Sequence, residues 1–181
     1  MHFRETPLKG AYLVELQPHR DGRGEFARVW CRDEFAREGI DVAMVQGNIS
    51  INPARGTLRG LHYQAAPHGE AKLVRCVRGA IYDVIVDIDP ASPSFRRWYG
   101  VELTPGSPML FVPPTCAHGF QTLLDDTEVN YLVSAPYAPA AARGLRYDDA
   151  ALAIQWPLPV SRISAADANW PLLGDGLSAV A

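Results

Sequence analysis

The fold of this chain is indicated most clearly by residues 72–88, which read KLVRCVRGAIYDVIVDI. Two runs rich in β-branched residues, 72–77 and 80–88, flank the turn-forming pair Arg78-Gly79, a pattern typical of two strands joined by a turn. Side chains of a strand alternate between its faces, so one face of the second run carries Ile81, Asp83, Ile85 and Asp87. Aspartates beside isoleucines indicate either a polar-lined cavity or one solvated face.

The same pattern of short apolar runs and turns extends along most of the chain. The sequence predicts further strands at 10–17, 26–30, 42–51, 57–64, 98–103, 109–112, 119–124 and 127–134. A turn is expected at 21–24, and a short helix over Asp33–Gly39, capped by Asp33 and stopped by Gly39. The chain has 15 glycines and 15 prolines, which separate these runs throughout its length. Together these features predict an all-β sandwich or barrel.

The C-terminal part of the chain differs in composition and predicts a covering tail. From Tyr137 onward the chain is rich in alanine and proline, and Asp148–Ile154 is consistent with one or two helical turns. Residues from about 148 to 181 are expected to pack on the barrel. A length of 181 residues without an internal repeat fits a single domain over 1–181.

Composition narrows the class of protein. Hydrophobic residues make up 48% of the chain, which argues against disorder, and the net charge of −3 argues against a nucleic-acid surface. The chain contains no apolar run of about 18 residues, so we expect no membrane-spanning helix. The N-terminus lacks the apolar core of a secretory signal. Three cysteines without CxxC spacing fit a reducing compartment. We therefore expect a cytoplasmic protein with no nucleic-acid or membrane partner.

Four polar side chains can meet inside such a barrel. Strand alternation places His62, Lys72, His118 and Tyr131 on faces that converge if all of them line the interior. An imidazole, with an ordinary pKa near 6.5, can accept a proton, and an ammonium can hold the negative charge that results. This combination suits the removal of a proton next to a carbonyl, as in an epimerase or isomerase.

Each of these residues also has a plainer interpretation. His62 can be a hydrogen-bonded structural histidine, His118 can satisfy a backbone carbonyl, and Tyr131 can be a core aromatic. Lys72 can extend its charge to solvent from an apolar stem, and Arg23 can be a solvated turn residue. The residue types alone do not decide between these interpretations.

The position of Arg59 leaves a second question open. Strict alternation sends Arg59 to the face opposite His62. Either Gly60 marks a bulge, or Arg59 serves elsewhere, for example in a neighbouring subunit's site.

Nine short motifs in order decide the interpretation, because the chain over roughly residues 5–173 resembles the dTDP-4-dehydrorhamnose 3,5-epimerase family. The motifs are Asp21-Gly22-Arg23-Gly24-Glu25-Phe26, Gln46-Gly47-Asn48-Ile49-Ser50, Gly56-Thr57-Leu58-Arg59-Gly60-Leu61-His62-Tyr63-Gln64, Glu70-Ala71-Lys72, Asp83-Val84-Ile85-Val86-Asp87, Ala117-His118-Gly119-Phe120, Val129-Asn130-Tyr131, Trp156-Pro157, and Ile163-Ser164 with Asp167.

The resemblance implies a fold, an activity and a site. The fold would be a cupin-type double-stranded β-helix jelly roll with a few short helices, in a homodimer that needs no metal or other cofactor. The activity would be nucleotide-sugar epimerisation in deoxysugar (rhamnose-type) biosynthesis: inversion of C3, C5 or both in a nucleotide-linked 4-keto-6-deoxyhexose, through an enolate. The matching catalytic residues are His62 (base), Tyr131 (acid), Lys72 (at the keto oxygen) and Asp167 (orienting the base); the matching substrate contacts are Arg23, Phe26, Gln46, Asn48, Arg59 and His118.

Three positions depart from the pattern of the family. Arg28 stands where many members carry a glutamate that contacts the nucleobase, Ala142 replaces another substrate-contacting acid, and Ala166 replaces a common lysine. An arginine cannot accept a hydrogen bond from a base imide N–H. The nucleobase, and the choice between C3 and C5, therefore stay open.

Two other classes of protein compete with the epimerase. A metal-dependent cupin isomerase or dioxygenase would need clustered ligands, typically HxH followed by a glutamate, whereas the residue two positions after His62 is Gln64. A non-catalytic sugar-binding cupin would not need an acid–base pair, so the retention of His62, Lys72 and Tyr131 argues against it.

Overall fold

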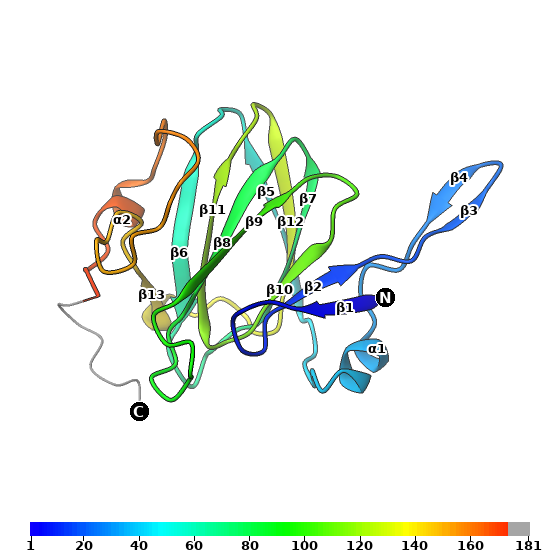
Figure 1. The fold of residues 1–181 in the computed structure, drawn as a ribbon, viewed down its shortest axis with the longest axis horizontal. Coiled ribbons are helices and arrows are strands. Elements are labelled where there is room, and N and C mark those ends of the chain that lie inside the picture. The colour runs from blue at the N-terminus through cyan, green and yellow to red at the C-terminus, as the bar shows by residue number, and fades with distance from the viewer. Residues whose placement is uncertain (174–181) are drawn as a thin grey trace.

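The computed structural model describes residues 1–173. Most of its strands form two large antiparallel sheets that face each other, and a two-stranded hairpin forms a third, small sheet (Figure 1). The first sheet has the order β1 (His2–Glu5), β2 (Tyr12–Glu15), β10 (Met109–Val112), β7 (Lys72–Arg78), β12 (Thr127–Val133), β5 (Gln46–Asn52). The second has the order β13 (Ala142–Gly144), β6 (Leu58–Gln64), β11 (Cys116–Thr122), β8 (Ile81–Asp87), β9 (Trp98–Leu103). This arrangement confirms the all-β sandwich or barrel that the strand pattern predicts, and it is the cupin-type jelly roll that the resemblance implies.

The stretch 72–88 contributes one strand to each layer. The chain leaves the first sheet at the end of β7, turns at Gly79 and enters the second sheet as β8. Ile81 and Ile85 then face the space between the sheets, while Val84 and Val86 lie in a separate apolar cluster on the other face. Because both faces of β8 are covered, one of the two alternatives for this strand, a solvated face, is wrong.

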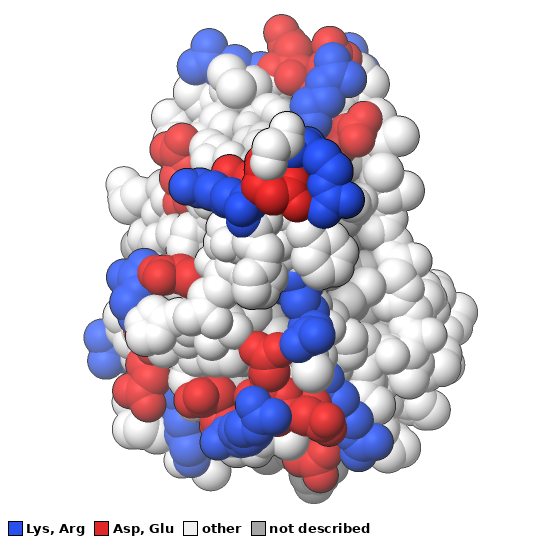
Figure 2. Space-filling model, turned by 90° about the vertical axis from the view of Figure 1, so that its right-hand side faces the viewer, with Lys and Arg blue, Asp and Glu red and all other residues white. Residues whose placement is uncertain are grey.

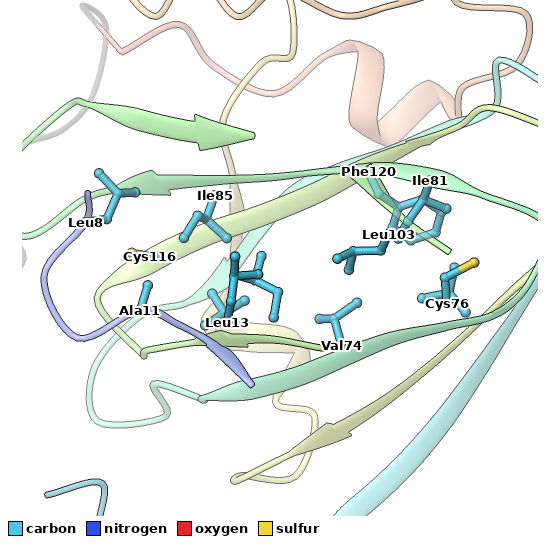
Figure 3. Packing of buried hydrophobic residues seen from close by; sticks show 13 residues of the cluster. Leu8, Ala11, Leu13, Val74, Cys76, Ile81, Ile85, Leu103, Cys116 and Phe120 are labelled. Atoms are coloured by element: carbon cyan, nitrogen blue, oxygen red, sulfur yellow. The ribbon is translucent and has the colours of Figure 1, made fainter. Parts of the chain in front are cut away.

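The main core fills one part of the space between the sheets. Figure 3 shows side chains from both sheets meeting there, among them Val74 and Cys76 of β7 and Ile81, Ile85 and Phe120 of the second sheet. All five are nearly inaccessible to solvent. Burying a side chain of this kind contributes about 1.5–3 kcal/mol, so this cluster holds the two sheets together.

Part of the outer face of each sheet is also covered. Helix α1 (Arg32–Arg37) inserts Phe35 against the first sheet, where its ring lies 5.7 Å from that of Phe111. On the second sheet, Leu152, Ile154 and Leu173 of the C-terminal segment pack in the same cluster as Val84 and Val86. Residues 174–181, the end of the predicted tail, lie outside the described residues.

The hairpin formed by β3 (His19–Asp21) and β4 (Gly24–Phe26) projects away from both sheets (Figure 1). The predicted turn at 21–24 is therefore confirmed. The predicted strand at 26–30 is wrong beyond Phe26, because the chain leaves the hairpin there and Trp30 packs on Phe35 with ring centroids 4.3 Å apart.

Three other expected boundaries need correction. The strand expected at 42–51 begins only at Gln46, because Val42 and Met44 pack irregularly around the cluster of Phe35. Cys31, not Asp33, is the N-cap of α1, and its side chain makes no capping bond. Residues 148–154 form turns rather than a helix; the helices nearby are η1 (Pro139–Ala141) and α2 (Ala165–Ala168).

Candidate active site

A cavity of about 1070 Å³ opens between the two sheets beside the main core. Its walls come from β5, β6, β7, β11 and β12 and from the C-terminal segment around α2. The predicted site residues that line it are Gln46, Asn48, Arg59, His62, Lys72, His118, Tyr131 and Asp167. The four side chains that strand alternation could bring together, His62, Lys72, His118 and Tyr131, thus line one compartment.

Arg59 lines the same cavity as His62, because β6 contains a bulge. His62 pairs with His118, and Arg59 pairs with Phe120. Arg59 and His62 are three residues apart on β6, but their partners are only two residues apart on β11, so β6 contains one extra residue. The extra residue reverses the alternation between Arg59 and His62. Of the two alternatives for Arg59, the bulge is therefore the one that the structure contains.

Two glycines make this bulge possible. Gly60 has a φ of +121°, and a Cβ built on it would lie 2.5 Å from the Cα of Gly119. A Cβ on Gly119 would in turn lie 2.6 Å from the carbonyl oxygen of Arg59. The two backbones thus approach too closely for any side chain, and this approach sets His62 and His118 side by side.

His62 is oriented by a buried carboxylate. Its Nε2 lies 2.6 Å from Oδ1 of Asp167, whose side chain is 8% exposed. Asp167 sits in α2, where its backbone N–H donates to the capping hydroxyl of Ser164. An ionised carboxylate only accepts hydrogen bonds, so the imidazole proton resides on Nε2 and Nδ1 carries the lone pair of a base.

The environment of Asp167 keeps it ionised. Burial alone would raise the pKa of Asp167, but hydrogen bonding and attraction from His62, with further bonds from the Gly60 N–H and the Trp170 indole, together lower it below its ordinary value. Asp167 therefore accepts from His62 throughout the neutral pH range.

Lys72 shares its part of the cavity with an acid that the sequence analysis did not select. The Nζ of Lys72 lies 2.9 Å from Oε1 of Glu70, and both side chains are largely buried. Nζ also donates to the backbone oxygen of His62 over 3.5 Å. Glu70 lies two positions before Lys72, the first residue of β7, so alternation extended by two residues could have found Glu70.

Tyr131 is held in its protonated form. Burial raises the pKa of Tyr131, and the negative charge of Glu70 raises it further, while Arg59 opposes this effect. The phenol therefore keeps its proton above pH 10, the ordinary value of tyrosine. A group that is protonated and faces the cavity is suited to donate a proton.

His118 forms a second imidazole–carboxylate pair with Asp83. Its Nε2 lies 2.6 Å from Oδ1 of Asp83, which is completely buried on β8. Asp83 is the aspartate that the alternation in 72–88 placed among isoleucines, and its partner explains why a carboxylate can occupy this face. The sequence pattern marked Asp83 as unusual but did not identify its partner.

Arg23 and Phe26 do not line the cavity of their own chain. Both lie in the projecting β3–β4 hairpin, where the Arg23 side chain is 90% exposed and paired with Asp21, and Phe26 is 75% exposed. Figure 2 views the molecule from this side and shows basic and acidic residues interspersed on it. Within one chain, these two residues are separate from the rest of the predicted site.

The three departures from the family pattern divide between two places. Arg28 lies outside the cavity and forms an ion pair of 2.8 Å with Glu34 of α1. Ala142 and Ala166 both line the cavity, so acidic and basic groups are absent from its wall at these positions. Arg143 and Arg162, which the sequence analysis did not select, also line it.

Residues 1–173 contain neither a cluster of metal-binding side chains nor a helix that could cross a membrane. Among these residues, no three His, Cys, Asp or Glu side chains gather in a group that could bind a metal ion. No helix among them is both long and apolar enough to span a bilayer.

Comparison with known proteins gives a consistent result. The sequence model of a family described as dTDP-4-dehydrorhamnose 3,5-epimerase matches residues 5–175. A dTDP-4-dehydrorhamnose 3,5-epimerase of Sinorhizobium fredii is 39% identical, over 96% of this chain and 90% of its own length. A dTDP-4-dehydrorhamnose 3-epimerase of Streptomyces niveus is 34% identical, over 99% and 87%.

A solved structure of a relative has the same fold as this chain. The dTDP-6-deoxy-D-glucose-3,5-epimerase of Legionella pneumophila, crystallised with dTDP-4-keto-L-rhamnose, is 33% identical and covers 96% of this chain and 93% of its own. The two superpose with a TM-score of 0.89.

Proposed function

Since the chain belongs to the dTDP-4-dehydrorhamnose 3,5-epimerase family, we propose that its cavity inverts C3, C5 or both in a nucleotide-linked 4-keto-6-deoxyhexose. The observation that carries this proposal is the meeting of His62, Lys72, His118 and Tyr131 around one cavity. A base, two potential cations and a protonated phenol in one compartment are what an enolate mechanism requires.

The reaction begins with the loss of a proton. The C4 ketone acidifies the hydrogens on C3 and C5, and Nδ1 of His62 removes one of them while Asp167 holds the proton on Nε2. The electron pair of the broken C–H bond moves to the ketone oxygen and gives an enolate. Lys72 and His118 stabilise this oxyanion within the cavity.

The reaction ends with the return of a proton from the opposite face. Tyr131 lies on β12 of the first sheet and His62 on β6 of the second, so the hexose is held between them. Donation by the phenol to the carbon that His62 deprotonated reverses its configuration. Arg59 and the polar side chains of Gln46 and Asn48 bind the nucleotide part of the substrate; a guanidinium suits a diphosphate.

A substrate panel in D₂O tests the proposed function. The purified protein is incubated with dTDP-, UDP-, CDP- and GDP-linked 4-keto-6-deoxyhexoses, and NMR locates the deuterium. We expect label at C3, C5 or both with at least one of these sugars, and the relatives favour the dTDP form. Label at neither carbon with all four nucleotides would contradict the proposal.

We further propose that the protein is a homodimer whose subunits exchange their β3–β4 hairpins. The hairpin projects from its own subunit and exposes Phe26, a large apolar ring, together with Arg23. An exposed aromatic on a projecting strand is stabilised by contact with a partner. The exchange would bring Arg23 and Phe26 into the partner's cavity and complete the predicted substrate contacts.

Mixing two inactive variants tests this exchange. Arg23→Ala and His62→Ala are each expected to lose most activity, but subunits that are unfolded and refolded together should recover about a quarter of it. In the mixed dimer, one site combines an intact hairpin with an intact imidazole. Activity can recover only if the hairpin of one subunit completes the cavity of the other. A mixture no more active than its components would therefore contradict the proposal.

A cytoplasmic location is also proposed. Cys31, Cys76 and Cys116 are all free thiols, as expected in a reducing compartment. Burial raises the pKa of Cys116 to about 12, so this thiol is inert.

A further inference from the structure

Trp170 lies beside the proposed base and has no role in the mechanism above. It follows α2 in the C-terminal segment and lines the cavity. Its indole N–H donates to Oδ1 of Asp167 over 3.2 Å, the same oxygen that accepts from His62. Its ring also stands edge-on to the imidazole of His62, with centroids 6.2 Å apart and an interplanar angle of 72°. Trp170 thus contacts both members of the His62–Asp167 pair.

The indole is seated on a glycine of the barrel. A Cβ built on Gly144 would lie 2.3–2.5 Å from three atoms of the Trp170 ring, so no other residue fits there without displacing the ring. Gly144 belongs to β13, and it pairs directly with His62 of β6. The glycine therefore allows the indole to lie against the strand pair that carries the base.

The segment that carries Trp170 is anchored on both sides of it. Before it, the backbone N–H of Leu58 on β6 donates to the carbonyl oxygen of Arg162 over 2.8 Å. After it, the backbone N–H of Leu173 donates to the buried carboxylate of Asp149 over 2.6 Å, and the Leu173 side chain is 4% exposed. Because these anchors hold the segment independently of the indole, Trp170 can be altered without releasing the segment.

We propose that Trp170 is a positioning residue for the base: seated on Gly144, its indole N–H fixes the Asp167 carboxylate so that it holds the proton on Nε2 of His62. This inference rests on the proposed function for its kinetic consequence, but its geometry concerns only three side chains and one glycine.

Loss of the indole N–H is expected to change the protonation of His62 in one direction. Oδ1 of Asp167 accepts from both the imidazole and the indole, and Oδ2 accepts from the Gly60 N–H. Loss of the indole donor leaves the carboxylate less stabilised, so it attracts the imidazole proton more strongly. Protonated His62 is then favoured to a higher pH, and protonated His62 is not a base.

Trp170→Phe tests this inference because phenylalanine keeps a ring on Gly144 but has no N–H. We expect kcat to fall about tenfold with little change in KM, and the acid limb of the kcat/KM profile to move up by roughly half a pH unit or more. Asp149→Asn is the matched control: it weakens the other anchor of the same segment, and should lower the Tm without moving the acid limb. An unmoved acid limb in Trp170→Phe would overturn the inference, as would an equal movement in Asp149→Asn.

A second measurement requires no substrate. The ¹⁵N shifts of the His62 imidazole report which nitrogen carries the proton and at which pH the ring titrates. We expect Nε2–H in the wild type and a titration midpoint at higher pH in Trp170→Phe. If the substrate panel fails but this midpoint moves, the proposed function is wrong and the positioning role stands. An unchanged midpoint contradicts the positioning role whatever the substrate.

Substitution of the glycine tests the seat itself. Gly144→Ala should lower kcat and release the indole, seen as a change in tryptophan fluorescence. Adding Gly144→Ala to Trp170→Ala should cost little more, because the group that clashes is already gone. Full activity in Gly144→Ala, or independent additive losses in the double variant, would contradict the seat.

Discussion

Replacing His62 by alanine is expected to lower kcat by about 10²–10⁴-fold and to abolish deuterium incorporation at the inverted carbon. The imidazole is the side chain whose geometry marks it as a base: Asp167 occupies Nε2 at 2.6 Å, which leaves Nδ1 available, and the side chain is 45% exposed toward the cavity. Alanine leaves no group there to accept a proton. Single-turnover reactions in D₂O, read by NMR, measure both quantities.

The matched control for this variant is His68→Ala. His68 is exposed, does not line the cavity and contacts Gln64 only through its backbone oxygen. It should react at the wild-type rate. Deuterium exchange that continues unchanged in folded His62→Ala would show that another group removes the proton.

Replacing Tyr131 by phenylalanine is expected to suppress inversion by about 10²–10⁴-fold while slowing the initial loss of the proton much less. The ring and its packing stay, and only the proton donor is removed. Deuterium should then return from the face of His62, which gives labelled substrate of unchanged configuration. Comparison of exchange with product formation, again by NMR in D₂O, separates the two steps.

The raised pKa of Tyr131 predicts how the activity of the wild type depends on pH at the alkaline end. Burial raises the pKa of Tyr131, and Glu70 raises it further, so the phenol stays a competent acid as the pH approaches 10. A loss of activity that sets in at lower pH must come from another group and should persist in Tyr131→Phe.

The control for Tyr131→Phe is Tyr99→Phe, because Tyr99 is a partly buried tyrosine of β9 that does not line the cavity. If both exchange and inversion stay at the wild-type rate in Tyr131→Phe, Tyr131 is not the acid.

Most of the site could be predicted because it follows from strand periodicity. Residues two apart on a strand share a face, and Lys72 and Tyr131 occupy the faces that this rule assigned to them. The rule fails where the backbone departs from it. At Gly60 the bulge adds one residue and turns Arg59 to the face of His62, and the sequence alone left this outcome open.

The residues that were missed are defined by contacts between distant segments. Asp83 is recognisable as a partner of His118 only when β8 and β11 lie side by side. Trp170 reaches Asp167 and Gly144 only after the C-terminal segment folds over β13. No periodicity within either segment encodes such contacts. The predicted role of Arg23 cannot be recognised even from the contacts within one folded chain, since that role requires a second subunit.

The most direct test of the central claim is a crystal structure with a bound nucleotide-linked 6-deoxyhexose whose C4 carries a hydroxyl in place of the ketone, so that it cannot enolise. The account predicts that Nδ1 of His62 and the hydroxyl of Tyr131 approach opposite faces of the same sugar carbon, at about 3–3.5 Å from it, with Lys72 next to the C4 oxygen. A hexose bound with both side chains on one face, or with either of them out of reach of the ring, would contradict it.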